Sequence, residues 1–456
     1  MRVLGFYDIS RAHFHSKARR KIAIKVPKED SDCKSGYAIL DKSMYGTKDA
    51  AQCFDLTVEE AMTVMGYSVG VFSPCLYHHP KTGVQVFRHG DDFVVLGTRQ
   101  QQKGFLAELG RTLIVKHLAT LGPNPALGDS KEVRILNRIV RWVKPPYGAG
   151  NERLEYEADP RHAELIVHQL GLSASSRGVS TPGEKSKPGA DFSTKVSKED
   201  HALYRSATMR LCYLALDRPD LQYPAKELAR WMQAPTLGDL EALKRVARYL
   251  VSHGRLVQQF VRQVAEPTSI IVYTDSDHAG CLCTRKSTSS TKLLYGSHLL
   301  RSTSSTQGII SLSTGESEFY SLVKGTAAGL GAVSMLKDLG VDLTENAKRD
   351  RPVVEVRMDA SAGRGVALRR GAGRIRHIAT PTLWVQKLTQ DGKIKVTKVP
   401  GATNPADLGT KHLSFEVINR CLEKCSCFFR SGRSDLALRA EVQEFYIGDD
   451  STDESC

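Results

Sequence analysis

Residues 269–322 read SIIVYTDSDHAGCLCTRKSTSSTKLLYGSHLLRSTSSTQGIISLSTGESEFYSL, and they determine the fold that we expect for the C-terminal half of the chain. The apolar, β-branched run 270–273 predicts a buried strand, which delivers Asp275 and Asp277 at its C-terminal end. A carboxylate at a strand end, together with another in the first turns of a helix packed on the same sheet, can hold a divalent metal ion near a phosphate.

The rest of this stretch predicts two strands and a helix. The strand-like runs 292–295 and 299–302 are separated by a Gly-Ser turn. The helix is expected to begin at Ser313, because a serine followed three residues later by Glu316 matches a capping box. Apolar residues then recur at helical spacing, at Phe319, Leu322, Val323, Ala327, Leu330 and Val333. The local pattern does not decide whether Glu316 or Glu318 joins the strand carboxylates.

Length and composition indicate a multidomain protein with a surplus of positive charge. At 456 residues the chain is too long for one ordinary core, and two or three domains are expected. Its 64 lysines and arginines against 50 aspartates and glutamates give a net charge of +14. This surplus suits a polyanionic partner such as nucleic acid without proving one.

The ten cysteines do not follow the spacing of a zinc site. They include a C-x-C pair at Cys281 and Cys283 and a C-x3-C-x-C set within 421–427, and neither is a paired-knuckle pattern. We therefore expect free thiols. The N-terminus lacks the apolar core of a signal peptide, and no apolar run reaches membrane-spanning length. These features predict an intracellular chain without a membrane partner.

The N-terminal part offers a second group of carboxylates. A short apolar strand, 2–7, ends in Asp8. Residues 83–97 read as strand, tight turn and strand, which lifts Asp91 and Asp92 to the tip of a hairpin. Adjacent carboxylates repel one another unless they are solvated or bridged by a cation. Taken alone, a solvated Asp-Asp turn is the simpler interpretation.

The remaining elements follow from composition and periodicity. A turn at 147–151 predicts a hairpin, and a polar linker rich in Lys, Ser, Gly and Pro runs to about residue 197. Helices are expected at 201–216, 225–232 and 236–252. An apolar strand, 353–358, then places Asp359 at its end, and a later strand, 394–399, precedes Asp407.

Several motifs occur in the order of one known family. The segments YTDSDHAG (273–280), SLSTGESEFY (311–320), DASA (359–362) and NPADLGTK (404–411) closely resemble the ribonuclease H domain of copia-type LTR retrotransposon Pol polyproteins. Segment YGTKDA (45–50) resembles the tyrosine-glycine-x-lysine motif of the reverse transcriptase in the same family. The resemblance extends over nearly the whole chain.

The resemblance implies a nuclease metal site. Asp275, Glu318, Asp359 and Asp407 line up with the four acidic residues of the ribonuclease H fold, which hold two Mg²⁺ ions, with Mn²⁺ as an alternative. It assigns the ligand roles to Asp275 over Asp277 and to Glu318 over Glu316. It also implies phosphate contacts from basic residues, namely Arg285, Lys286, Arg374, Arg376 and Lys411.

The resemblance implies a polymerase site as well. Asp8 and Asp91 correspond to the Mg²⁺ ligands of the polymerase palm, and Asp92 to their less essential neighbour. His13, His89 and Ala360 depart from the family pattern. Because the chain begins shortly before Asp8, we expect the finger residues that grip the incoming triphosphate to be missing. Polymerisation by this chain alone is therefore expected to be absent or very weak.

By this resemblance the fold class is α/β and α+β, in four parts. They are a truncated reverse transcriptase palm and thumb (1–183), a linker and helical connection (184–266), a ribonuclease H-like mixed sheet with helices (267–414), and a C-terminal extension with an acidic tail at 448–456 (415–456). The implied partners are RNA–DNA hybrid, RNA template, DNA and other Pol-derived chains, in the cytoplasm within virus-like particles or in the nucleus.

The resemblance implies one function and leaves one alternative. The function is metal-dependent hydrolysis of RNA in RNA–DNA hybrids, with RNA-directed DNA polymerase activity inherited from the family. The alternative is a catalytically silent nucleic-acid-binding remnant of a decayed element. The acidic quartet favours the enzyme, whereas the departures at His13, His89 and Ala360 favour the remnant.

Overall fold

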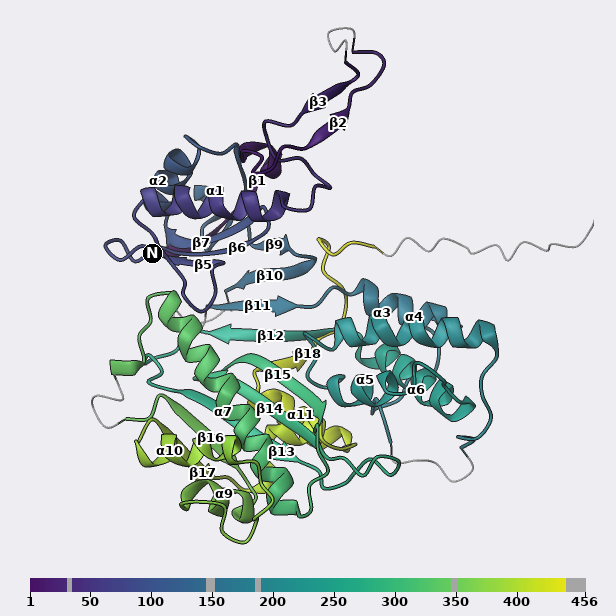
Figure 1. The fold of residues 1–456 in the computed structure, drawn as a ribbon. Coiled ribbons are helices and arrows are strands. Elements are labelled where there is room, and N and C mark those ends of the chain that lie inside the picture. The colour runs from purple at the N-terminus through teal and green to yellow at the C-terminus, as the bar shows by residue number, and fades with distance from the viewer. Residues whose placement is uncertain (31–34, 145–151, 185–189, 346–350, 440–456) are drawn as a thin grey trace, which may run out of the picture.

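A computed structural model describes residues 1–30, 35–144, 152–184, 190–345 and 351–439 (Figure 1). Within these ranges the chain forms three larger sheets and a two-stranded ribbon, with helices packed on them. The mixed α/β and α+β class predicted from the sequence is confirmed. The expected turn at 147–151 and the expected acidic tail at 448–456 lie outside the described residues.

The N-terminal part is a six-stranded antiparallel sheet with two helices on one face. In spatial order its strands are β4 Ser68–Val69, β5 Leu76–His78, β6 Gln85–His89, β7 Asp92–Thr98, β1 Arg2–Ile9 and β8 Val115–Leu121. Helices α1 (Ala50–Val64) and α2 (Arg99–Leu109) contribute Phe54 and Phe105 to one core with Tyr7 of β1. The predicted hairpin is confirmed as β6 and β7.

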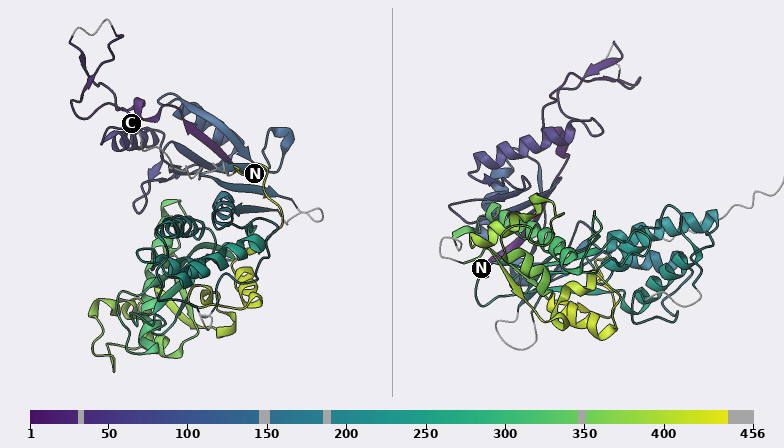
Figure 2. Two further views of the ribbon diagram at one scale, coloured as in Figure 1. Left: turned by 90° about the vertical axis from the view of Figure 1, so that its right-hand side faces the viewer. Right: turned by 60° about the horizontal axis from the view of Figure 1, so that its bottom comes forward.

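A two-stranded arm projects from this part (Figure 2). It consists of β2 (Ala23–Lys25) and β3 (Tyr37–Ile39). The opposite face of the main sheet carries Phe6, which packs with Val133 of the next sheet because neighbouring residues of a strand point to opposite faces. The first two sheets therefore share a core.

The second sheet joins segments that are far apart in the sequence. Its five strands are β18 Cys427–Phe429, β12 Leu256–Val261, β11 Arg153–Glu157, β10 Arg138–Val143 and β9 Glu132–Ile135. Four helices share one hydrophobic core beside it: α3 Arg161–Gln169, α4 Lys198–Leu214, α5 Gln222–Ala229 and α6 Leu237–His253. The division expected at 183/184 falls between α3 and α4, so this core continues across it, and the division itself stays a prediction.

The third sheet is mixed and carries helices on both faces. Its strands are β15 His298–Thr306, β14 Thr288–Tyr295, β13 Ile270–Ser276, β16 Val354–Met358 and β17 Ile394–Lys398. Strands β13, β16 and β17 run parallel, and the expected strands 292–295 and 299–302 are confirmed within β14 and β15. One face packs on α7 Thr314–Asp338, α9 Ser361–Leu368 and α10 Trp384–Gln390, and the other on α11 Phe415–Lys424 and the short 3₁₀ helix η5 Pro405–Gly409.

Helix α7 begins where the sequence predicted, but its capping box is half formed. The Ser313 hydroxyl accepts a hydrogen bond from the Glu316 amide at 3.2 Å. The Glu316 carboxylate accepts one from the amide of Leu312 at 2.9 Å, instead of from Ser313 itself. The prediction of the second hydrogen bond of the box is therefore wrong by one residue. The Glu316 carboxylate also accepts a hydrogen bond from His377, which lies outside the helix.

Two glycines let α7 lie close to the sheet. A Cβ atom on Gly325 would lie 2.5 Å from Cγ2 of Thr274 on β13. One on Gly329 would lie 2.8 Å from Cγ1 of Val354 on β16. Real Cβ atoms do not approach this closely, so both positions require glycine for the helix to keep its depth. This depth brings the first turns of α7 over the end of β13.

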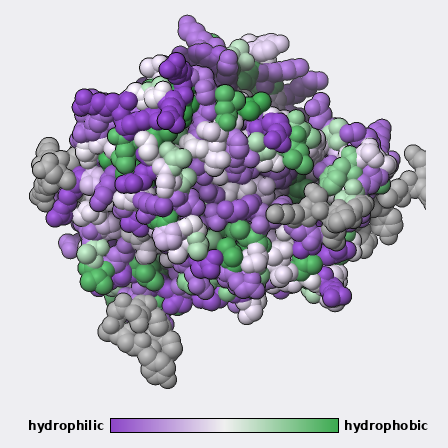
Figure 3. Space-filling model, turned by 90° about the horizontal axis from the view of Figure 1, so that it is seen from below, coloured by the Kyte–Doolittle hydropathy of each residue, from purple (hydrophilic) through white to green (hydrophobic). Residues whose placement is uncertain are grey.

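The surface offers no membrane-spanning element among the residues described. None of their helices is both long and apolar enough to cross a bilayer. On the face seen from below, apolar residues occur in small groups separated by hydrophilic ones (Figure 3).

We predict that Gly325→Ala and Gly329→Ala each destabilise the fold by about 1–3 kcal/mol, as is usual for overpacking a core. Gly104→Ala is the matched control, because Gly104 lies in helix α2 and a Cβ atom added there would meet nothing within 4 Å. That change should instead stabilise by about 0.5–1 kcal/mol through helix propensity. Urea unfolding of the three variants measures the sign and size of each change in the free energy of unfolding. Equal changes at Gly104 and Gly325 would refute the close packing of α7.

Candidate active site

Three carboxylates from three elements meet at one end of the third sheet. Asp275 lies near the end of β13, Glu318 in the second turn of α7, and Asp359 directly after β16. One oxygen of each lies within 4.8 Å of the others. The parallel pairing of β13 with β16 brings the two strand ends to the same edge, and α7 crosses above them. The structure thus brings together three of the four expected acidic residues.

Burial makes ionisation of this group unfavourable. Desolvation raises the pKa of Asp275 to about 7, and the negative charge of Asp407 adds to the shift. Desolvation likewise raises the pKa of Glu318 to about 9, with further contributions from Asp275 and Asp359. The carboxylates therefore compete for protons unless a positive charge is bound among them.

Asp407, the fourth expected residue, stands beside the three rather than among them. It lies in η5 and pairs with the ammonium group of Lys411 at 3.0 Å. The same ammonium lies 3.9 Å from Oδ2 of Asp275, and the Thr410 hydroxyl donates a hydrogen bond to that oxygen. Burial lowers the pKa of Lys411, but Asp275 and Asp407 outweigh it and raise the pKa overall. Lys411 is therefore held as a cation beside the site.

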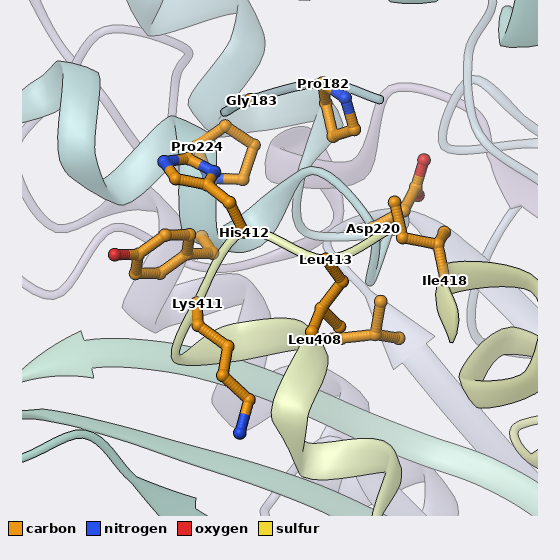
Figure 4. Close-up of a pocket in the computed structure, with 10 residues that line it drawn as sticks. Pro182, Gly183, Asp220, Pro224, Leu408, Lys411, His412, Leu413 and Ile418 are labelled. Atoms are coloured by element: carbon orange, nitrogen blue, oxygen red, sulfur yellow. The ribbon is translucent and has the colours of Figure 1, made fainter. Parts of the chain in front are cut away.

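Figure 4 shows Lys411 directed away from the neighbouring His412 and Pro224. These two residues help to line a cavity of about 10 Å³, which has room for about one water molecule. This cavity is too small for a substrate, so the carboxylate cluster is the better candidate.

The structure separates the two glutamates of α7. Glu318 joins Asp275 and Asp359, whereas Glu316 accepts a hydrogen bond from Nε2 of His377 at 3.0 Å and one from the amide of Leu312. Asp277 is also turned away, because its carboxylate accepts from the amide of Thr288 and so closes the turn after β13. Neither Glu316 nor Asp277 is part of the cluster.

The cluster fits a hard divalent cation. Its donors are carboxylate oxygens, which Mg²⁺ prefers. Glu318 Oε2 is buried and has no hydrogen-bond partner among the described residues. An unpaired buried oxygen is costly, and a bound cation would satisfy it. The cluster could bind a metal ion, and which ion it takes remains a prediction.

The carboxylates expected for polymerisation lie on the first sheet. Asp8 of β1 is the direct partner of Asp92 on β7, and the exposed Asp91 occupies the turn before it. Burial raises the pKa of Asp92, with added repulsion from Asp91 and Asp8. Among the described residues these three do not form a group as close as the one on the third sheet. His13 stacks on Tyr45, with ring centres 4.3 Å apart.

Four of the five expected phosphate-binding residues lie in two segments that follow β13 and precede α10. Arg285 and Lys286 lie in the turn between β13 and β14, and Arg374 and Arg376 lie in the segment before α10. The pair between His377 and Glu316 ties that segment to the first turn of α7. Whether these residues bind phosphate stays a prediction.

Sequence reasoning missed the residues that hold the cluster in place. The Ser321 hydroxyl donates to the backbone oxygen of Asp275 at 2.7 Å, and Asn404 Nδ2 donates to that of Thr274 at 3.0 Å. Ser321 lies one turn after Glu318 on the same helix, and this spacing could have indicated that Ser321 faces the same strand end. The eight cysteines at described positions form no disulfide, and their freedom from metal stays a prediction.

The family is settled by comparison with known proteins. No known family profile matches the chain. The chain is 26% identical over 390 residues to the retrovirus-related Pol polyprotein from transposon RE1 of Arabidopsis thaliana, a match that covers 84% of this chain and 24% of the relative. It is 23% identical over 431 residues to that from transposon TNT 1-94 of Nicotiana tabacum, covering 91% of this chain and 30% of the relative. The chain belongs to the copia-type retrotransposon Pol polyproteins.

This Pol polyprotein chain spans about a quarter to three tenths of the length of those relatives. It is also 32% identical over 173 residues to an uncharacterised mitochondrial protein of Arabidopsis thaliana, covering 37% of this chain and 68% of that protein. The resemblance in motifs is thus matched by similarity along most of the chain.

We predict that the metal-free Pol chain loses stability as the pH rises. The pKa of Asp275 is raised from 3.8 to about 7 and that of Glu318 from 4.5 to about 9. Their contribution to the free energy of unfolding is therefore fully present below about pH 4 and is lost as the pH rises through about 7 to 9. The melting temperature in EDTA should therefore fall between pH 6 and pH 9, and Mg²⁺ should restore it most at the upper end.

Glu318→Gln should flatten this dependence, because an amide does not ionise. Glu241→Gln, at an exposed position of helix α6, is the matched control and should follow the unmodified chain. If Glu318→Gln and the unmodified chain lose stability in parallel, the burial of the carboxylate cluster is refuted.

Proposed function

We propose that this chain hydrolyses the RNA strand of RNA–DNA hybrids in a reaction that requires a divalent metal ion. The observation that carries the proposal is the buried cluster of Asp275, Glu318 and Asp359. Membership of the Pol family adds support, since the acidic motifs occur here in that family's order. A pair of Mg²⁺ ions would supply an activated water and would stabilise the leaving oxygen.

The chain's own groups then have distinct tasks. The Thr410 hydroxyl and the Ser321 hydroxyl fix Asp275 from its side chain and its backbone, so that its free carboxylate oxygen keeps one orientation. Lys411 offsets negative charge beside Asp275 and Asp407. Because Lys411 is half exposed, it can also meet a phosphate that approaches the cluster.

Recognition of the hybrid is assigned to the two basic segments. Arg285 and Lys286 lie within the turn that Asp277 closes, and Arg374 and Arg376 precede His377, which Glu316 holds. Asp277 and Glu316, which hold these segments, each lie two residues from a carboxylate of the cluster, and this supports a role for the basic groups on either side of the cleaved bond. Duplexes containing RNA are recognised by groove shape and by 2′-hydroxyl and phosphate contacts, which suits such flanking cations.

We predict that Asp275→Asn and Glu318→Gln lower Mg²⁺-dependent cleavage of a hybrid far more than Glu316→Gln. Loss of a group that only orients its neighbours typically costs about 10–100-fold, and loss of a metal ligand should exceed that. Glu316→Gln should fall in the lower range, because an amide oxygen holds His377 and the basic segment less firmly than a carboxylate. Release of labelled RNA fragments measures all three rates.

Equal cleavage by Asp275→Asn and the unmodified chain would overturn the proposal. Tight hybrid binding without any cleavage would favour the alternative, a silent nucleic-acid-binding remnant. One observation favours that alternative: Ala360, at the N-cap of α9 beside Asp359, gives the helix no side-chain cap.

We also propose that polymerisation by this chain is absent or very weak. The support is geometric, because Asp91 is exposed at the turn and His13 is occupied by its stacking on Tyr45. Nucleotidyl transfer needs the triphosphate aligned with the primer end, and misplacement by about 1 Å can cost on the order of 100-fold in rate.

Primer extension on an RNA template tests this second proposal, with Asp91→Asn run alongside. We predict no extension above the level of the variant. Robust extension by the unmodified chain that Asp91→Asn abolishes would contradict it.

A further inference from the structure

A second concave site lies outside the family's motifs, between α6, α11 and β18. Its volume is about 500 Å³, within the range of small-ligand sites. It is lined by Ser252, His253, Phe415, Asn419, Glu423, Cys427, Phe428, Phe429, Arg430 and Ser431. We call it the α11 pocket.

Aromatic rings form the wall of the α11 pocket. The rings of Phe415 and Phe429 are nearly parallel, with an interplanar angle of 21° and centres 6.2 Å apart. The imidazole of His253 lies 4.8 Å from the ring of Phe415 and 4.9 Å from that of Phe429. Three aromatic side chains from three elements therefore line one space together.

This wall is held rigidly from behind. His253 stacks on the buried Tyr249, whose hydroxyl donates to Asp220 at 2.9 Å. Asp220 is paired with the buried Arg218, and Arg218 also donates to the backbone oxygen of His253 at 2.9 Å and lies over the ring of Phe429. Because these contacts exist without a ligand, little ordering would be needed on binding.

Polar and charged side chains complete the lining of the α11 pocket. Phe415, Asn419 and Glu423 recur every four residues and so lie along one face of α11. They offer an aromatic ring, an amide and a carboxylate in sequence. Arg430 follows β18 and adds an exposed guanidinium group at the rim. A planar ligand that bears hydrogen-bond donors at its edge and a negative charge fits this set.

We propose that the α11 pocket binds one unpaired nucleotide of a single-stranded segment. The base would stack against Phe415 and His253, the amide of Asn419 and the carboxylate of Glu423 would meet its hydrogen-bonding edge, and Arg430 would meet its phosphate. A purely apolar ligand would leave these polar groups unpaired. The net charge of +14 also favours a polyanion.

The proposal rests on the proposed function in one respect, namely that the chain's partner is nucleic acid. Helix α11 packs against η5, which carries Asp407. A strand that leaves the carboxylate cluster could therefore continue towards the α11 pocket. The site would hold the unpaired end of a hybrid whose paired part lies at the cluster.

The experiment measures binding by fluorescence anisotropy in EDTA, using a labelled hybrid with a single-stranded RNA overhang and the same hybrid with blunt ends. Stacking on an aromatic side chain contributes about 1–3 kcal/mol per base, so Phe415→Ala should weaken binding of the overhang hybrid about 5- to 150-fold. Blunt-hybrid binding should not change. Phe415→Tyr, which keeps the ring, should restore the affinity.

Two further variants separate this proposal from the others. Arg430→Ala, at an exposed position, should weaken overhang binding selectively. Asp275→Asn should leave the ratio of overhang to blunt affinity unchanged even where cleavage is lost, so failure of the nuclease proposal would be seen separately. Equal affinity of Phe415→Ala and the unmodified chain for the overhang hybrid, or equal weakening for both hybrids, would overturn the α11 pocket as a nucleotide site.

Discussion

Mutual repulsion among three close carboxylates, two of them buried and Asp359 half-buried, is the constraint under which this end of the third sheet is built. Asp275, Glu318 and Asp359 approach within 4.8 Å only because β13 and β16 are parallel neighbours and α7 is held close above them. Left alone, such a group favours protonation, as the raised pKa values of Asp275 and Glu318 indicate. A fold that places them together without a cation gives up stability, and this is a common feature of sites built for function.

Helix α7 connects this site with the N-terminal sheet. Its first turns carry Glu318, and its last residue, Asp338, accepts hydrogen bonds from the backbone amides of Val71, Phe72 and Ser73 at 2.9, 3.0 and 2.8 Å. One carboxylate that satisfies three amides forms a firm link, because charge-assisted hydrogen bonds are the stronger kind. The helix thus spans from the carboxylate cluster to the sheet that bears Asp8 and Asp92.

Sequence reasoning predicted the local elements well, because each is encoded by a short pattern. The β6–β7 hairpin, the strands around Asp275 and the start of α7 all follow from apolar periodicity and turn residues. It could not predict the second sheet, in which β11 pairs with β12 and β12 with β18, since such pairings depend on contacts between segments a hundred or more residues apart. For the same reason, periodicity left Glu316 and Glu318 equal, whereas distant residues separate them: Glu318 joins Asp275 and Asp359, and Glu316 meets His377.

Anomalous diffraction from crystals soaked in Mn²⁺ at pH 8 tests the central claim most directly, because it locates the ion without reference to activity. The account predicts a peak in coordination contact with carboxylate oxygens of Asp275, Glu318 and Asp359. That peak should vanish in Asp275→Asn crystals treated in the same way. A peak confined to Asp8 and Asp92, or none near the cluster while Lys411 keeps its place beside Asp275, would contradict it.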